Sequence, residues 1–576
     1  MAPKKASKNL FFAKLIHDAE ETVKERDIAQ TPLIAIVVAL FLDRLNFVAF
    51  INSVLRWDEK QWHVSPGNLA KSVVLTPFLC KGTRIPLYGI SENFQSVDMS
   101  LLFQDRVKPE WLTRDAFACL LDRVYAAGCE QIFTNIALKV YSVFKIPFKS
   151  IFHGDTTSII LYGEYEGEES KPDGPATPAH GYSKDGKPNL KQVLIGMVTD
   201  TFGIPLSITV RDGNQNDSKW NNAIIDSLAD LLKTATGGIT YIADSKLTTG
   251  PNIKKLLQHA FHFVTVCPVN FEKKIAERVR QSAYLNNEWT NIGTYREPRT
   301  VNLALYEVQE FLKPACDTIC RLLVFRSSET KKDAMKALDK EKTDVLALIK
   351  TSTSKEFSCQ ADALKEIKSL EKSLKNRVWT TVFTLATKEI ASEKRGRGRP
   401  PKNAKPVPTV TIWMIHADEL IIRQERYDLF RWRAESFILF TNVMPDDASA
   451  VEILRLYKEQ KTVEDNFSVL KRPAMIDSLF LHLPRRIVAL ITLLSFALLI
   501  QVIIRILVQR NLDAMEVKPG IDHDGKPIAR IGLKKIIRFL GYYTIISEDG
   551  EKYCICKTKK HRHHLITWLN LLEIKF

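Results

Sequence analysis

The sequence lacks the features of a secreted, disulfide-stabilised protein. Its nine cysteines are odd in number and show no framework spacing along 576 residues. They are Cys80, Cys119, Cys129, Cys267, Cys316, Cys320, Cys359, Cys554 and Cys556. The first twenty residues carry lysines but neither a long apolar core nor a small-residue cleavage site, so we expect no secretory signal. These absences predict reduced thiols and a cytoplasmic protein.

Long apolar runs are also scarce. One stretch, from Ile487 to Ile504, has no charged residue and is flanked by arginines. Its length would allow a short membrane span, but it contains the polar residues Thr492, Ser495 and Gln501. We therefore favour a buried core helix and no membrane partner, with a membrane-associated protein as the alternative.

The charge is unbalanced toward the basic side. With 82 Lys and Arg against 66 Asp and Glu, the formal net charge is +16. Such an excess predicts an anionic partner, either nucleic acid or an anionic membrane. Residues 151–270 are the exception, because their 10 basic and 13 acidic residues give a net charge of −3. A negative segment inside a basic chain indicates a place that attracts cations.

The pattern of apolar residues predicts an α/β protein. Residues 1–150 have mainly helical spacing, whereas residues 151–270 read as strand, hairpin, helix, strand, helix and strand. Residues 329–376 have the spacing of a helical hairpin, and the runs between Thr409 and Trp432 resemble strands. Residues 446–472 read as one long helix with Asp446 or Asp447 as its cap, followed by the apolar helix.

Three acidic residues stand out by position. Asp155 lies within an apolar strand, Asp244 ends another, and Glu464 lies on the long predicted helix. A carboxylate in an apolar strand is costly unless it has a partner or a metal ion. Carboxylates brought together repel each other, and a divalent cation relieves that repulsion. Taken singly, each acid also has an ordinary explanation as a turn, cap or surface residue.

The helix around Glu464 carries an unusual stripe. Tyr457, Gln460, Glu464 and Lys471 lie at offsets of 0, 3, 7 and 14 residues, which places them on one face of a continuous helix. An aromatic ring, an amide, an acid and a lysine do not form a core face. The stripe indicates either a functional surface or a solvated salt-bridge face.

These motifs together resemble an insertion-sequence DDE transposase with an RNase H-like core. The segment from Tyr457 to Lys471 fits the spacing of the Tyr-x2-Arg-x3-Glu-x6-Lys signature of one branch, with Gln460 in place of the arginine. FHGDTTS resembles the first-acid motif at Asp155, and YIADSKL resembles the second at Asp244. The resemblance covers residues 150–270 and 436–500 well and the N-terminal part more weakly.

The resemblance implies a role for each of these residues. Asp155, Asp244 and Glu464 would be the catalytic acids and would bind two Mg²⁺ or Mn²⁺ ions. Tyr457, Gln460 and Lys471 would contact DNA, although glutamine puts the phosphate contact at position 460 in doubt. The activity would be cleavage at transposon ends and transfer of the 3′-hydroxyl into target DNA.

A basic motif lies in the central region, shortly before the strand-like runs that begin at Thr409. KRGRGRPPK includes Arg395, Arg397 and Arg399 and resembles the core of an AT-hook. An extended segment of this kind inserts arginines into a narrow, A·T-rich minor groove. The alternative is a flexible basic linker that binds phosphates without reading sequence.

We therefore predict an RNase H-like mixed sheet with flanking helices, interrupted by a mixed insertion domain and preceded by a helical domain. The expected parts are 1–150 for DNA-end binding, 151–270 and 436–510 for the core, 271–435 for the insertion, and 511–576 as a C-terminal region. The expected partner is double-stranded DNA, bound as a homodimer on paired ends and associated with a bacterial nucleoid. The alternative is a catalytically inactive DNA-binding protein derived from a transposase.

Overall fold

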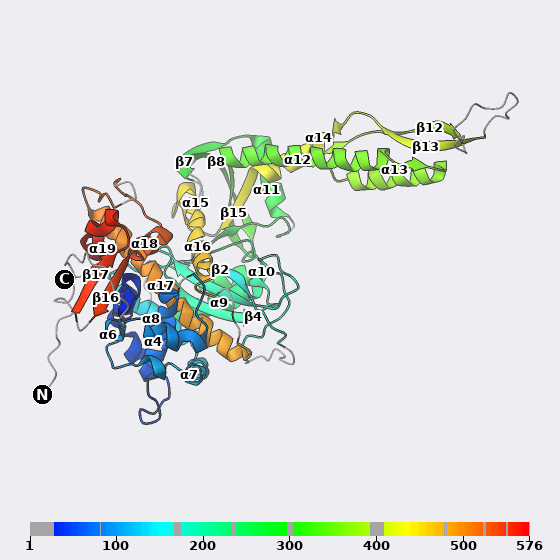
Figure 1. The fold of residues 1–576 in the computed structure, drawn as a ribbon. Coiled ribbons are helices and arrows are strands. Elements are labelled where there is room, and N and C mark those ends of the chain that lie inside the picture. Colours follow the sequence, from blue (N-terminus) through cyan, green and yellow to red (C-terminus); the bar gives the residue numbers. More distant parts are fainter. Residues whose placement is uncertain are drawn as a thin grey trace. The chain divides into compact units, whose positions relative to one another are not determined.

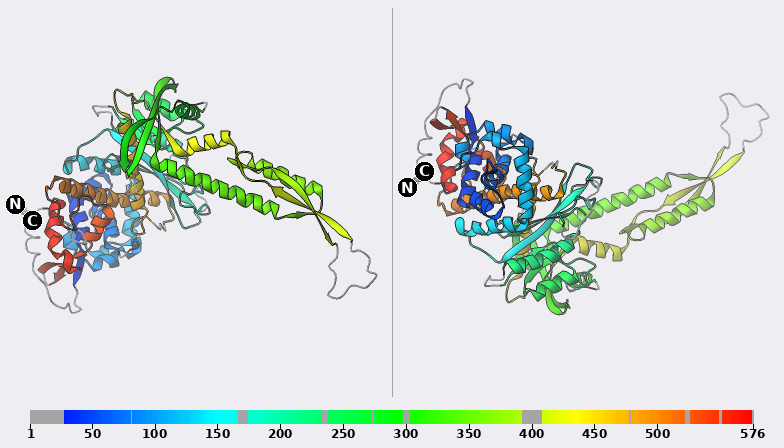
Figure 2. Two further views of the ribbon diagram at one scale, coloured as in Figure 1. Left: turned by 90° about the horizontal axis from the view of Figure 1, so that it is seen from above. Right: turned by 90° about the horizontal axis from the view of Figure 1, so that it is seen from below.

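The computed structural model describes residues 28–574, apart from 81, 166–173, 233–237, 273, 297–302, 392–407, 477–478, 480, 522–525 and 549–550. The chain divides into two compact units (Figures 1 and 2). The first contains Met1–Phe263 and Leu456–Phe576, and the second contains Val264–Arg455. The predicted insertion boundaries, 271 and 435, both fall inside the second unit.

The N-terminal part of the first unit is helical, in agreement with its apolar spacing. Ser65 and Thr113 cap two of the helices by accepting hydrogen bonds from backbone amides of the first turn. The helices are α2 (Leu33–Arg44), α3 (Phe47–Val54), α4 (Pro66–Leu79), α5 (Ile90–Gln95), α6 (Met99–Leu102), α7 (Arg114–Ala126) and α8 (Cys129–Val143), with the short turns η1 (Leu87–Gly89) and η2 (Pro109–Trp111).

A mixed sheet forms the centre of the first unit. Its strands are β2 (Ile151–Ile160), β3 (Gln192–Asp200), β4 (Pro205–Asp212), β5 (Thr240–Ala243) and β6 (His262–Val266), and their order is β4-β3-β2-β5-β6. β2 runs parallel to β5 and antiparallel to β3, which makes a hairpin with β4. The helices α9 (Asp217–Leu231) and α10 (Gly250–Gln258) belong to the same segment. Together with the flanking helices, this mixed α/β architecture is the predicted RNase H-like fold.

The chain enters the second unit within β6 and returns within α15 (Ala450–Lys458). It continues through α16 (Lys461–Leu470) into the long helix α17 (Pro484–Ala514). Among the described residues, α17 is the one single helix long and apolar enough to cross a membrane, and a bent pair, α2 with α3, passes the same test when taken together. The apolar window of α17 is entirely buried, against helices that include α4, α7 and α8 (Figure 1). This burial supports the core-helix interpretation.

The C-terminal region belongs to the first unit and pairs with its N-terminal strand. β16 (Tyr543–Glu548) pairs with β17 (Glu551–Cys556) and also with β1 (Ala29–Pro32) from the other end of the chain. The remaining elements are α18 (Leu533–Leu540), η3 (Lys559–His564) and α19 (Leu565–Leu571).

The second unit combines a sheet with a long helical hairpin. Its strands β15 (Ser436–Thr441), β9 (Thr318–Ser327), β8 (Leu303–Ala315) and β7 (Thr290–Arg296) pair in that order, and α11 (Ile275–Asn286) packs against β9 and β15. The hairpin comprises α12 (Ser328–Thr353) and α13 (Gln360–Leu374), with β10 (Glu356–Phe357), β11 (Trp379–Thr380), β12 (Phe383–Ala391), β13 (Thr409–Ala417), β14 (Ile421–Ile422) and α14 (Gln424–Glu435). Val345, Ile349 and Leu374 form its small buried core.

Three local predictions were wrong. The run after β14 is the helix α14 rather than a strand, and none of its residues is buried, so no apolar face marked it as helical. The single helix predicted for residues 446–472 is two helices, broken at Glu459 and Gln460. The hydroxyl of Thr462 donates to the carbonyl of Glu459, 2.9 Å away, at this break. Ser449, rather than Asp446 or Asp447, caps α15. Its hydroxyl accepts a hydrogen bond from the backbone amide of Glu452, and its own amide donates to the carboxylate of Glu452.

The packing of α17 predicts a large effect of core truncation on stability. Phe496 is fully buried, and its ring lies 5.1 Å from that of Phe47 and 5.0 Å from that of Phe133. We expect Phe496→Ala to lower the free energy of unfolding by about 3–5 kcal/mol, because it leaves a cavity between three helices. Urea unfolding measures the change. Val517→Ala, at a position 86% exposed, is the control and should change little; equal stability of the two variants would contradict the core-helix interpretation.

Candidate active site

The pairing of β2 with β5 brings two of the predicted acids together. In this parallel ladder Gly154 lies opposite Ala243, so the residues that follow, Asp155 and Asp244, lie side by side. Asp155 is within β2, whereas Asp244 directly follows the last residue of β5. Each carboxylate is held locally, since Asp155 accepts the amide of Thr156 at 2.7 Å and Asp244 accepts that of Lys246 at 2.9 Å.

A glycine beside the first acid allows the two strands to pack in this way. The buried ring of Tyr241 lies over Gly154, and a Cβ atom at that position would be only 1.9 Å from the tyrosine hydroxyl. That hydroxyl donates to the Oδ1 of Asn221 on α9, 2.9 Å away. Position 154 of the FHGDTTS motif therefore needs glycine, because the Tyr241 side chain occupies the space that any larger residue would fill.

Burial and like charge act on both carboxyls. Burial is the largest influence on Asp155 and raises its pKa to about 6, with smaller upward contributions from Asp244 and Asp217. Burial also raises the pKa of Asp244, and Asp217 adds to the increase. The ammonium of Lys184 lowers the pKa of both. The two acids are thus poorly solvated and mutually repelling.

Glu464 and Tyr457 lie on different helices of the first unit. Glu464 is in the first turn of α16 and is exposed to solvent, whereas Tyr457 is near the end of α15. Burial raises the pKa of the Tyr457 phenol to about 12, with further contributions from Asp244, Glu464 and Asp155. The phenol therefore lies in the electrostatic field of all three acids and remains protonated at neutral pH, which makes it a hydrogen-bond donor.

The other two members of the predicted stripe have different surroundings. Gln460 is 9% exposed and precedes the first residue of α16 at the helix break. Lys471 follows the last residue of α16, and its ammonium lies 2.8 and 2.9 Å from the carboxylate oxygens of Asp185. The structure thus gives Lys471 a protein partner. The predicted DNA-binding residues Arg395, Arg397 and Arg399 lie outside the described residues.

Three residues beside the acids were missed in the sequence. The ammonium of Lys184 lies 2.6 Å from the carbonyl oxygen of Thr156, 2.9 Å from its hydroxyl and 3.3 Å from a carboxylate oxygen of Asp217. The Thr156 hydroxyl in turn donates to Asp217, 2.7 Å away. Lys184 belongs to a Gly- and Pro-containing loop without periodicity, so the only available signal was its place in the segment HGYSKDGKPN.

The chemistry of the donor set suits a hard divalent cation. Mg²⁺ and Mn²⁺ prefer carboxylate oxygens, and binding would offset the repulsion between Asp155 and Asp244. Within the described part of the chain, however, no three Asp, Glu, His or Cys side chains are grouped closely enough to hold an ion. The pair Asp155 and Asp244 thus offers carboxylate oxygens of the kind that such an ion prefers, whereas Glu464 is not grouped with them in the described part of the chain.

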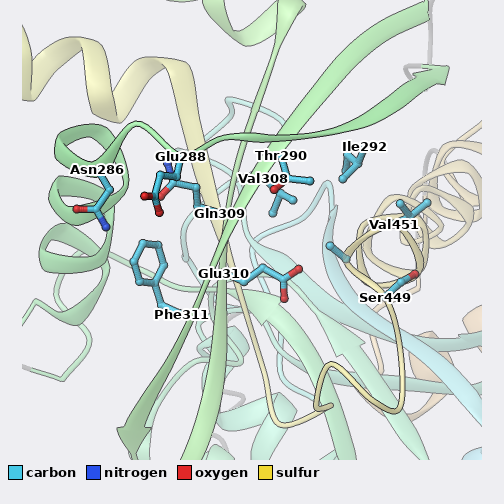
Figure 3. Close-up of a pocket in the computed structure, with 11 residues that line it drawn as sticks. Asn286, Glu288, Thr290, Ile292, Val308, Gln309, Glu310, Phe311, Ser449 and Val451 are labelled. Carbon is cyan, nitrogen blue, oxygen red and sulfur yellow. The ribbon is translucent and has the colours of Figure 1, made fainter.

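A separate pocket of about 560 Å³ lies in the second unit (Figure 3). Residues of β7, β8 and the start of α15 line it, including Glu288, Glu310 and Ser449. Its lining contains two carboxylates and no lysine or arginine, and none of the predicted site residues. This pocket does not have the chemistry of a phosphate-binding site.

Comparison with known families gives two matches. A family model described as "Transposase DDE domain" matches residues 164–500, which is more than half of the chain. Asp244, Tyr457, Glu464 and Lys471 fall inside this range, and Asp155 lies just before it. A model described as "Domain of unknown function (DUF4277)" matches residues 29–138. No curated protein matches the chain.

The raised pKa of Asp155 predicts a pH-dependent effect on stability without metal. Its folded-state pKa of about 6 exceeds the ordinary value of 3.8, so its contribution to stability is fully present below pH 3.8 and is lost as the pH rises through 6. Asp155→Asn keeps an oxygen to accept the Thr156 amide but removes the charge. At pH 8 in chelator we expect the variant to be more stable by about 1–2 kcal/mol, after allowance for solvent screening, with no gain near pH 4.

Thermal unfolding at the two pH values measures this effect. The control is Asp226→Asn, because hydrogen bonding to Lys255 lowers the pKa of Asp226, and its loss should not stabilise the protein at pH 8. A lower melting temperature for Asp155→Asn at pH 8 would contradict the assignment of Asp155 as an electrostatically strained group.

Proposed function

The chain belongs to the transposase DDE domain family, and from that premise we propose that it cleaves DNA at the ends of a mobile element and joins them to target DNA. The observation that carries this proposal is the parallel pairing of β2 with β5, whose last pair is Gly154 and Ala243, the residues that directly precede Asp155 and Asp244. Tyr457, within the field of these two acids and of Glu464, adds a donor for a phosphate oxygen. The overall charge of +16 suits a long polyanionic substrate.

The family generally uses divalent metal ions. We propose that Asp155, Asp244 and Glu464 are the catalytic acids and together hold two Mg²⁺ or Mn²⁺ ions. Such ions activate an attacking hydroxyl and stabilise a leaving oxygen in phosphoryl transfer. In this arrangement Asp155 and Asp244 lie at the paired strands of the sheet, and Glu464 approaches them from α16. Other residues of the chain bind and orient the DNA.

The proposed reaction has two in-line steps at this site. In the first, the oxygen of water attacks a phosphorus atom at the element end, and the bond to the 3′ oxygen breaks to release a 3′-hydroxyl. In the second, that 3′-hydroxyl attacks a phosphorus atom of target DNA and displaces another 3′ oxygen. Tyr457 donates to a phosphate oxygen, and the ammonium of Lys471, which has three N–H donors, binds a phosphate while it stays paired with Asp185.

The remaining assignments complete the proposal. The helical part, residues 1–150, binds DNA ends, residues 151–270 and 436–510 form the catalytic core, and the insertion at 271–435 presents the basic segment. Residues 511–576 pack as a C-terminal region. Gln460 has no charge to offer a phosphate, so its contribution is limited to hydrogen bonding. The protein acts as a homodimer on paired ends, in the cytoplasm and in association with the bacterial nucleoid.

The acids give the direct test. Asp155→Asn, Asp244→Asn and Glu464→Gln are each expected to lower end cleavage in Mg²⁺ by about 10³-fold or more, with DNA binding retained in Ca²⁺. A labelled duplex carrying the element end reports cleavage. Asp226→Asn, an acid on α9 paired with Lys255, is the control and should cleave normally. Full cleavage by all three variants would overturn the mechanism, and DNA binding without cleavage by the wild type would favour the inactive, transposase-derived protein.

The basic segment gives a second prediction. Replacing Arg397 and Arg399 with alanine should reduce the salt dependence of DNA binding, lowering the slope of log K against log salt by about 1 for each phosphate that the variant no longer neutralises. If the segment reads the minor groove, the affinity will fall further on A·T-rich than on G·C-rich duplexes. Fluorescence anisotropy at several salt concentrations measures both. An unchanged slope would show that these arginines do not contact DNA.

A further inference from the structure

The turn that contains Lys184 and Asp185 connects the structural elements of two proposed acids. Lys184 is anchored to β2, since its backbone amide donates to the hydroxyl of Ser158 at 3.2 Å and its ammonium donates to the carbonyl of Thr156 at 2.6 Å. Thr156 directly follows Asp155 in the strand. Lys184 therefore fixes the turn at the point where β2 carries the first acid.

The next residue is anchored to a different element. The carboxylate of Asp185 makes two contacts with the ammonium of Lys471, at 2.8 and 2.9 Å. Lys471 directly follows the last residue of α16, the helix that carries Glu464 about two turns earlier. Its side chain is 24% exposed and that of Asp185 is 36% exposed, so solvent only partly screens this ion pair.

The backbone of the turn makes the two anchors act as one unit. Lys184 and Asp185 are consecutive, and Gly186 follows with φ of +70°, a conformation that favours glycine. The amide of Lys187 donates to the hydroxyl of Ser183 across the turn, 3.0 Å away. A displacement of α16 is thus transmitted through two adjacent residues to the strand of Asp155.

We propose that Lys184 and Asp185 are positioning residues that set the distance of Glu464 from the acid pair. The inference rests on the proposed function, in which Glu464 completes the metal site. Asp185 holds the end of α16 through Lys471, and Lys184 holds β2 through Thr156. Removal of either anchor lets Glu464 drift from Asp155 and Asp244, which weakens metal binding more than it impairs the chemical step.

The proposal predicts a separation between metal dependence and maximal rate. Asp185→Asn should raise the Mg²⁺ concentration for half-maximal end cleavage about tenfold, as for other residues that orient metal ligands, with the rate at saturating Mg²⁺ largely recovered. Lys184→Gln should also raise it but by less, because loss of a cation beside the acids favours Mg²⁺ and partly offsets the lost anchor. The double variant should need no more Mg²⁺ than Asp185→Asn alone, because each change breaks the same connection. Asp185→Glu keeps the ion pair and should stay close to the wild type.

Two measurements distinguish this role from a general loss of structure. Lys187→Gln is the matched control, since it removes a lysine of the same turn whose ammonium donates to the hydroxyl of Tyr162, 3.2 Å away, rather than to β2 or α16. It should leave the Mg²⁺ requirement unchanged. Hydrogen exchange of the metal-free, DNA-free protein is the second readout, and amides of Lys461–Leu470 should exchange faster in Asp185→Asn than in the wild type.

The outcomes separate this inference from the function on which it rests. A wild type that neither cleaves DNA nor responds to Mg²⁺ overturns the proposed function and the inference with it. A wild type that cleaves normally, together with an unchanged Mg²⁺ requirement and unchanged exchange in Asp185→Asn, overturns the positioning role alone. Tighter DNA binding by Asp185→Asn without any change in Mg²⁺ requirement would also overturn it, because Asp185 would then only compete with phosphate for Lys471.

Discussion

The parallel ladder between β2 and β5 holds two carboxylates in a place where neither is well solvated. Gly154 lies opposite Ala243, and the Tyr241 ring packs over the glycine, where a larger side chain would clash. Asp155 and Asp244 follow these two residues, and burial with like charge raises the pKa of both. A cation bound near both carboxylates would offset this repulsion.

The loop that contains Lys184 offsets part of the negative charge of the two acids. The ammonium of Lys184 lowers the pKa of both acids and binds Thr156 and Asp217. It does not balance the charge, since Asp217 adds another carboxylate whose effect on both acids is upward. The local deficit agrees with the net charge of −3 for residues 151–270 in a chain of +16. Positive charge elsewhere suits DNA, and the negative centre suits divalent cations.

The sequence predicted those parts of the candidate site that depend on local pattern. Asp155 and Asp244 were visible because an acid in an apolar strand needs an explanation, and α17 was visible because its apolar run is long. The break between α15 and α16 was not, because the residues around Gln460 include neither glycine nor proline, and a side-chain hydroxyl at Thr462 binds a helix carbonyl there. Lys184 and Asp217 could not be found, since their contacts with Thr156 bridge 28 and 61 residues and arise only from the fold.

Gln460 is uncharged, so the positive charge of Lys184 has to be considered together with it. The signature that this chain resembles has an arginine at that position on the helix, whereas here a buried, uncharged amide lies at the helix break. A neutral side chain there neither repels a bound metal ion nor offsets the acids. The ammonium of Lys184, in the loop, lowers the pKa of both Asp155 and Asp244. Because the next residue of that loop binds Lys471, the same turn influences both the charge of the acid pair and the place of the helix that bears Glu464.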